Sequence, residues 1–302
     1  MTTLESTKHI SLKNILYLTD FSEPSEVALP FAIEIARAYG ASVYALHVLV
    51  PSSVVYMTPE SPASAIEWQE EAAQNEMQRV DAQLMGLPHE TIVERGTEIW
   101  PALEQAIKEH AIGLIVLGTH GRTGMQKLLL GSAAEEVFRR SPVPVITIGP
   151  GVQSSIHNDA RFRRVLFPTD FTSESLAAEP YALSLAEENQ ARLILLHVIR
   201  KLRQRHVDHD GELSVAEALH QLYELVPEEV EQWCRPEAVV EHGEPADRIL
   251  QTAEERDADL IVLGVRDASR NLKAATHLDR ATAYKIVANA HCPVLTVRAA
   301  IN

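Results

Sequence analysis

The apolar residues of the first 150 positions follow two kinds of pattern. Short runs with little polar interruption, such as NILYLTD and GLIVLG, alternate with longer segments in which apolar residues recur every three or four positions. In the segment SEPSEVALPFAIEIARAYG, Val27, Phe31 and Ile35 follow the helical spacing, and Gly40 is suited to end a helix. The chain is therefore expected to alternate between buried strands and amphipathic helices.

The order of these segments predicts a doubly wound α/β fold. Strands that lack an apolar–polar alternation and are separated by helices indicate a parallel sheet covered on both faces. In such sheets, ligands bind beyond the carboxyl ends of the strands, where the strand order reverses. The strands are expected at 14–20, 42–49, 90–96, 113–118 and 142–148, and the helices at 22–40, 64–86, 100–111 and 133–141.

The second half of the chain repeats the first. The segment that begins at Lys13 aligns without gaps with the segment that begins at Arg163, at an offset of 150 positions, and both contain the letters TDF and LHV. A repeat of this length is the size of a domain, and 302 residues suffice for about two domains. We therefore predict a duplicated domain, at residues 1–150 and 151–302, with a linker near GPGVQSSIHNDAR.

Charge and composition narrow the functional classes. The formal net charge is −15, which opposes general binding to the phosphates of nucleic acids. The sequence contains no apolar run long enough to span a membrane and no apolar core of a signal peptide. Two cysteines, Cys234 and Cys292, are too few for a disulfide framework. We therefore expect a cytoplasmic protein that binds neither nucleic acid nor membrane.

A glycine-rich segment, GTHGRTGMQKLLLGS, follows the fourth predicted strand from Gly118 to Ser132. It matches neither the Walker loop nor the dinucleotide fingerprint. Its glycines would still let the backbone approach an anion, and a helix that begins near Ser132 would offer backbone N–H groups to phosphate. Ser132 and Glu135 also have the spacing of a capping box. The spacing alone leaves open a phosphate site and a plain flexible loop.

The pattern G-x2-G-x9-G-S after a fourth strand, with TDFS at the end of the first, resembles the ATP-binding branch of the universal stress protein family. The resemblance covers both halves, as in tandem members. It implies two doubly wound five-stranded parallel-sheet domains of the adenine nucleotide alpha hydrolase-like class, paired through their fifth strands. The tandem chain would then be an intrachain pseudo-dimer.

The resemblance also implies an ATP site in the first half. Thr19 and Asp20 would contact the adenosine, Asp20 by a hydrogen bond, and the backbone of Val48 would contact the adenine. Leu117 would lie beside the adenine, and Gly118 beside the ribose and phosphates. A divalent cation, expected to be Mg²⁺, would accompany the ATP. The residues implied around the triphosphate are His120, Gly121, Gly131, Ser132, Ala133 and Ala134.

Several of these residues have a structural alternative. Asp20 could cap the turn that follows it, as Asp often does, and Val48 is also suited to the core. His120 is expected to contact phosphate through its backbone instead of acting as a general base. Arg122 could screen the phosphate charge or be solvated. The sequence assigns no catalytic and no metal-ligating residue.

The second half departs from the glycine pattern. Gly264 is kept, but Asp267 stands opposite Gly121, and Arg280 stands opposite Gly131. A carboxylate at this place would repel phosphate. We therefore predict that this half does not bind ATP in the manner of the family. Thr169, Asp170 and Val198 remain and leave open a weak adenosine or other small-ligand site.

These observations favour a cytoplasmic ATP-binding stress-response protein. Its first half would act as a nucleotide-dependent binding or sensor module for an unidentified protein partner, as an intrachain pseudo-dimer or a homodimer. One alternative is a slow ATP hydrolase, although the sequence indicates no positioned general base and no arginine finger. An adenylating enzyme is disfavoured because TDFSEPSE lacks a pyrophosphate loop of the Ser-Gly-Gly type. Another alternative is an interaction protein that binds no nucleotide.

Overall fold

The computed structural model describes residues 10–50, 62–119, 130–152, 161–200, 213–227, 230, 234, 236–265 and 277–299. The chain divides into two compact units, one formed by Ser11–Pro150 and the other mainly by Gly151–Asn302. We refer to them as the first and the second half.

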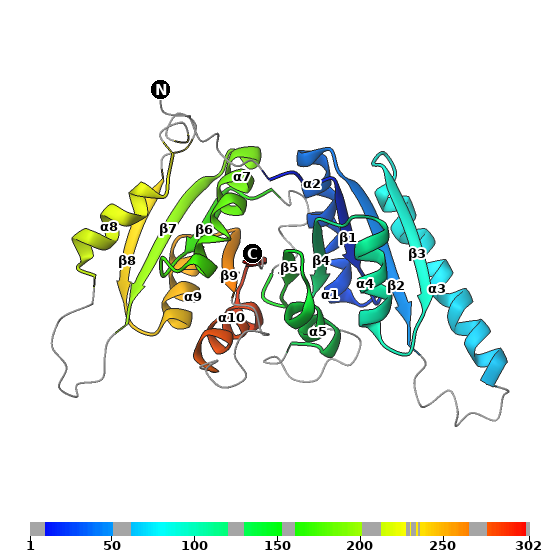
Figure 1. The fold of residues 1–302 in the computed structure, drawn as a ribbon. Coiled ribbons are helices and arrows are strands. Elements are labelled where there is room, and N and C mark those ends of the chain that lie inside the picture. Colours follow the sequence, from blue (N-terminus) through cyan, green and yellow to red (C-terminus); the bar gives the residue numbers. More distant parts are fainter. Residues whose placement is uncertain are drawn as a thin grey trace. The chain divides into compact units, whose positions relative to one another are not determined.

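The first half contains a parallel five-stranded sheet in the order β3-β2-β1-β4-β5 (Figure 1). The chain adds β2 and β3 on one side of β1, and β4 and β5 on the other. The strand order therefore reverses between β1 and β4, and the ligand crevice of a doubly wound sheet is expected beyond the ends of these two strands. The strands are β1 (Asn14–Leu18), β2 (Ser42–Leu49), β3 (His89–Arg95), β4 (Leu114–Gly118) and β5 (Val145–Ile148).

The helices of the first half follow the predicted order, but the segment expected as one helix at 22–40 forms two. Pro30 lies in the first turn of the second of these helices. A proline has no N–H group, and in an unbroken helix its ring would clash with the carbonyl four residues earlier. Gly40 ends this helix in the left-handed conformation, with φ +62°, as predicted. The helices are α1 (Glu23–Glu26), α2 (Leu29–Tyr39), α3 (Pro62–Leu84), α4 (Ile99–Glu109) and α5 (Ser132–Arg140).

The second half has the same architecture, with strand order β10-β9-β6-β7-β8 and parallel pairing. The two halves agree in detail: the N–H of Thr19 donates to Leu46 O, and that of Thr169 donates to Leu196 O. The predicted α/β fold class is therefore confirmed, and pairing through the fifth strands stays a prediction. The elements are β6 (Arg164–Pro168), α6 (Ser173–Leu176), α7 (Glu179–Asn189), β7 (Arg192–Ile199), α8 (Val215–Glu224), β8 (Glu237–His242), α9 (Pro245–Glu255), β9 (Leu260–Val265), α10 (His277–Asn289) and β10 (Val294–Arg298).

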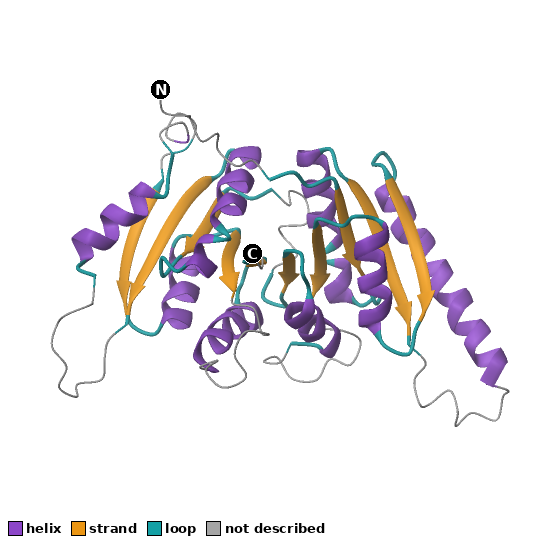
Figure 2. Cartoon of the chain, in the orientation of Figure 1, coloured by secondary structure: helices purple, strands orange, loops and turns teal. Residues whose placement is uncertain are grey.

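The central strands form the core of each half. Ile15, Leu16 and Tyr17 are fully buried although their side chains alternate between the two faces of the sheet. Both faces can be apolar because helices cover both (Figure 2). Within the described part of the chain, no helix is long and apolar enough to cross a membrane.

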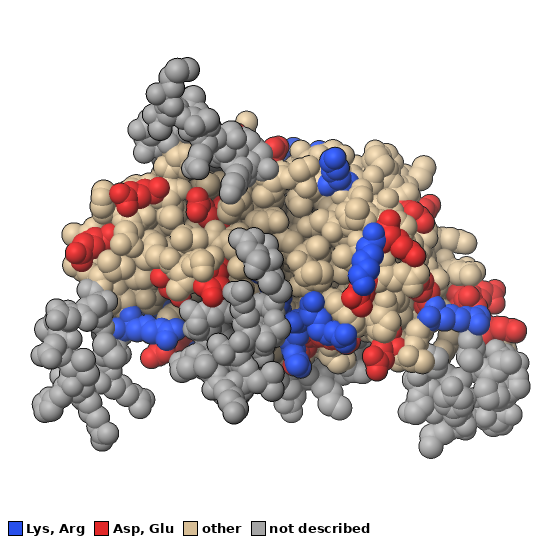
Figure 3. Space-filling model, in the orientation of Figure 1, with Lys and Arg blue, Asp and Glu red and all other residues tan. Residues whose placement is uncertain are grey.

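Acidic and basic side chains are mixed on the surface of the described residues. On the face shown in Figure 3, Lys and Arg lie close to Asp and Glu. Several of these residues form ion pairs within one helix, such as Arg37 with Glu34 and Lys108 with Glu104. Exposed pairs of this kind stabilise a helix by only about 0.3–0.5 kcal/mol each. Each such pair places opposite charges next to each other on the helix surface.

Candidate functional site

A tight turn joins β1 to α1 and carries the first predicted site residues. Phe21 has a positive φ of 57°, and its N–H donates to Thr19 Oγ1 at 3.0 Å. The backbone N–H of Ser22 donates to Asp20 Oδ1 at 3.1 Å, and the Ser22 hydroxyl donates to the same oxygen at 2.5 Å. Asp20 therefore caps the turn through one carboxylate oxygen, which is the structural role that the sequence left open.

The second half repeats this turn. Phe171 has φ +61°, its N–H donates to Thr169 Oγ1 at 3.0 Å, and the N–H of Thr172 donates to Asp170 Oδ1 at 3.1 Å. Because the turn recurs in the half that lacks the glycine pattern, the letters TDF are explained by turn geometry in both halves and do not by themselves indicate a nucleotide.

A buried histidine on β2 holds the turn in place. His47 Nδ1 lies 2.8 Å from Thr19 O. Because a carbonyl oxygen only accepts, this nitrogen carries the proton and donates a hydrogen bond to the carbonyl. The imidazole also packs on Phe21, with ring centroids 4.3 Å apart. His197 repeats both contacts, with Thr169 O and Phe171. The sequence did not reveal that His47 supports the turn, although the recurrence of LHV in both halves was the available signal.

The strand ends and α5 enclose a small cavity of about 80 Å³ at the predicted place. Several predicted site residues line it together, from the ends of β1, β2 and β4 and from the first turn of α5. Three others, His120, Gly121 and Arg122, lie outside the described residues. The predicted site residues that line the cavity are Thr19, Asp20, Val48, Leu117, Gly118, Ala133 and Ala134.

The backbone of Val48 faces the crevice. Leu46 O accepts the N–H of Thr19, so the polar groups of Leu46 point toward β1. Polar backbone groups two residues apart on a strand point to the same side. The paired residues of β1 end at Leu18, opposite Leu46, so the N–H and C=O of Val48 point into the space beyond the end of β1.

The N-terminus of α5 differs from the capping box that the sequence suggested. Gly131 is the N-cap, with φ −60°, and no side chain caps the helix. Its own N–H donates to Thr119 O at 2.7 Å, and the N–H of Glu135 donates to Gly131 O. Ser132 is therefore the first residue of the helix, and the capping-box interpretation of Ser132 is wrong because the helix begins one residue earlier than that motif requires.

The glycine at the end of β4 has a structural cause. A Cβ atom at Gly118 would lie 2.5 Å from Pro24 O, on the backbone of α1. A Cβ at Gly264 would meet the backbone of Glu174 and Ser175 in the same way. Close packing of the strand end against the short helix that follows the first strand of each half therefore explains this glycine in both halves, whether or not a ligand is present.

Both repeats match the model of the universal stress protein family, over residues 11–149 and 161–298. The chain belongs to the universal stress protein family. A universal stress protein of Methanocaldococcus jannaschii is 35% identical over 139 residues, which are 45% of this chain and 81% of that protein. One from Mycolicibacterium smegmatis is 27% identical over 266 residues, or 83% of this chain and 86% of that protein. The tandem arrangement is therefore shared with a known member.

A solved structure supports the same fold over nearly the whole chain. The crystal structure of a universal stress protein from Archaeoglobus fulgidus covers 96% of this chain and 99% of its own, with a TM-score of 0.69 and 22% identity. At this identity the likeness concerns the fold, and the ligand of this universal stress protein has to be argued from its own residues.

Proposed function

We propose that this universal stress protein binds ATP through its first half and that the bound nucleotide controls its contact with a protein partner. One observation carries the proposal. The ends of β1, β2 and β4 and the uncapped start of α5 converge on one cavity at the point where the strand order reverses. This is the place where doubly wound sheets bind nucleotides.

The described residues offer a contact for each part of ATP. The Asp20 carboxylate lines the cavity and would accept a hydrogen bond from a ribose hydroxyl. The Val48 backbone, which points beyond β1, would pair with the adenine edge. The phosphates would lie at the N-terminus of α5, where the first backbone N–H groups and the Ser132 hydroxyl can donate to anionic oxygens. The roles proposed for His120, Gly121 and Arg122 stay predictions.

The cavity is small relative to ATP, and the proposed control of a partner rests on a change of conformation. Its volume of about 80 Å³ is well below the roughly 300–1,000 Å³ of typical small-molecule pockets. The described cavity would therefore hold only part of ATP, and the phosphates would extend beyond it to the start of α5. A ligand that favours one of two conformations shifts the population toward it, so the bound nucleotide would change the surface offered to a partner.

A binding role is better supported than rapid hydrolysis. Asp20 is the carboxylate among the described residues that line this cavity, and its Oδ1 already accepts two hydrogen bonds from Ser22. His47 Nδ1 donates to the backbone. The Asp20 oxygen Oδ1 is therefore occupied by the turn, and the His47 ring, whose Nε2 remains the possible base, is buried against Phe21. Mg²⁺ would be held chiefly by the phosphates and water, as is common for this ion.

The experiment compares two substitutions of one residue, Gly131→Asp and Gly131→Asn. Gly131 has φ −60°, which any residue adopts, and both Asp and Asn are favourable N-caps. The two side chains have nearly the same shape, so the charge is the main difference. Calorimetric titration with ATP and Mg²⁺ is expected to give at least tenfold weaker binding for Gly131→Asp than for Gly131→Asn.

The thermal midpoint of unfolding serves as the control for folding. It is expected to be unchanged or slightly raised in both variants because a capping side chain is added to α5. Equal ATP affinity of the two variants would place the phosphates away from α5 and contradict the proposed site. Absence of ATP binding by the unmodified chain would favour an interaction protein that binds no nucleotide.

A further inference from the structure

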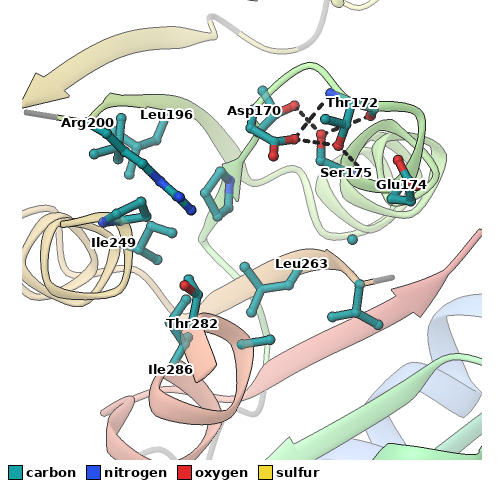
Figure 4. A pocket seen from close by; sticks show the side chains of 17 residues that line it. Asp170, Thr172, Glu174, Ser175, Leu196, Arg200, Ile249, Leu263, Thr282 and Ile286 are labelled. Atoms are coloured by element: carbon teal, nitrogen blue, oxygen red, sulfur yellow. Dashed lines mark hydrogen bonds between the residues drawn. The ribbon is translucent and has the colours of Figure 1, made fainter. Parts of the chain in front are cut away.

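The second half contains a larger cavity at the position equivalent to the ATP site. It has a volume of about 310 Å³ and is formed by the ends of β6, β7 and β9 together with α6, α9 and α10 (Figure 4). This volume reaches the lower end of the range of small-molecule pockets, roughly 300 Å³. The second-half cavity is therefore large enough for a compact ligand without movement of its walls.

Its lining differs from that of the first half in charge. At the offset of 150 positions, Arg200 stands where the first half has Val50. Arg200 lines the second-half cavity, and in Figure 4 its side chain points toward the cavity from the end of β7. It is the cation among the described lining residues. A guanidinium matches a planar carboxylate with two parallel hydrogen bonds.

Two carboxylates lie on another side of the same cavity. Asp170 and Glu174 belong to the turn after β6 and to α6, and both line the cavity. Figure 4 shows them at the side of α6, away from Arg200. Carboxylates at this side would repel a second anionic group and would accept a hydrogen bond from a neutral donor.

The walls between these charged groups are largely apolar. Leu263, Ile249 and Ile286, from β9, α9 and α10, face the cavity together with Leu196 and Val198 of β7. Apolar walls with a few polar groups at fixed places are typical of small-molecule sites. The middle of a ligand should therefore be apolar.

We propose that the second-half cavity binds a compact aromatic monoanion. Its carboxylate pairs with Arg200, its ring lies against the apolar walls, and a hydroxyl or amino group at the far end donates to Asp170. This ligand class differs from the nucleotide proposed for the first half. The assignment rests on the second-half cavity and on Arg200, so it stands or falls independently of ATP binding.

Three matched fluorescent probes test the proposal on the full chain: 6-hydroxy-2-naphthoate, its neutral analogue 6-hydroxy-2-naphthamide, and naphthalene-2,6-dicarboxylate. Fluorescence titration is expected to give at least tenfold tighter binding of the hydroxy acid than of the amide, because the amide has no charge for Arg200. The dicarboxylate is expected to bind at least tenfold more weakly than the hydroxy acid, because it presents a second anion to Asp170 and Glu174.

Two arginine variants locate the binding site. Arg200→Met is expected to abolish the preference for the hydroxy acid over the amide. Arg248→Met is the control, because Arg248 also lies in the second half but donates to Gln251 on α9 instead of lining the cavity. The control should keep the preference, and both variants should keep the thermal midpoint of the unmodified chain.

The competing outcomes are distinct. Absence of hydroxy-acid binding, equal binding of acid and amide, or an unchanged preference in Arg200→Met would each overturn the proposal. Displacement of the hydroxy acid by saturating ATP would also overturn it, because the probe would then share the nucleotide site. Gly131→Asp is expected to bind the probe like the unmodified chain, even if ATP binding in the first half fails its own test.

Discussion

At the scale of single residues, the motifs that both halves share have two structural causes, which are close backbone packing and hydrogen bonds within a turn. Gly118 and Gly264 lie where a strand end meets the backbone of a short helix. The carboxylates of Asp20 and Asp170 accept hydrogen bonds from backbone N–H groups of their own turns. The sequence shows that these residues recur. It does not reveal whether packing, a turn or a ligand requires them, because each of these can require the same residue type.

Substitution of Gly118 by alanine is expected to destabilise the chain. The added Cβ would overlap the backbone of Pro24 and Ser25, and forced displacement in a packed region costs about 1–3 kcal/mol. The change in the free energy of unfolding can be measured in urea. Gly113→Ala is the matched control, because its Cβ would lie 3.6 Å from Leu12 Cδ2, an ordinary contact. If Gly118→Ala were as stable as this control and had lost only ATP binding, the packing explanation would be wrong.

The two cysteines are expected to be unreactive in the folded chain. Burial raises the pKa of the Cys292 thiol to about 12 and also raises the pKa of Cys234. Both side chains are buried, and the reactive thiolate is therefore rare near neutral pH. Labelling with a disulfide reagent should be slow under native conditions and complete in denaturant. Rapid labelling of either thiol in the folded chain would contradict the described packing.

At the scale of elements, the hydrophobic pattern predicted the strands and their parallel arrangement well. The pattern did not predict helix boundaries that depend on local backbone chemistry. Pro30 divides the segment 22–40 into two helices, and α5 begins at Ser132 with Gly131 as its N-cap. The end of α7 shows a further case. Gln190 has φ +51° at the position that Gly40 occupies in the first half, so the same helix end forms without the glycine that signals it.

This helix end gives a prediction of increased stability. A non-glycine residue in the left-handed conformation costs about 1–2 kcal/mol, and Gln190 is exposed. Gln190→Gly is therefore expected to raise the free energy of unfolding of the second half by about 1 kcal/mol. Gln190→Ala, which keeps a Cβ, is the control and should show no such gain. A Gln190→Gly variant less stable than the unmodified chain would contradict the assigned conformation.

At the scale of the whole molecule, duplication placed two equivalent sites in one chain, and their side chains have since diverged. The sequence revealed the duplication and the loss of the glycine pattern in the second half. It did not reveal that the larger cavity lies in that half, because cavity volume depends on how side chains from several elements pack. Arg200 was visible in the sequence, but only the fold shows that it lines the cavity.

The number of ATP molecules bound per chain tests the central claim most directly. Native mass spectrometry of the full chain with ATP and Mg²⁺ would be compared for the unmodified protein and Gly131→Asp. We expect one ATP per unmodified chain and none for the variant. Two ATP molecules per unmodified chain, or one retained by Gly131→Asp, would contradict the assignment of nucleotide binding to the first half alone.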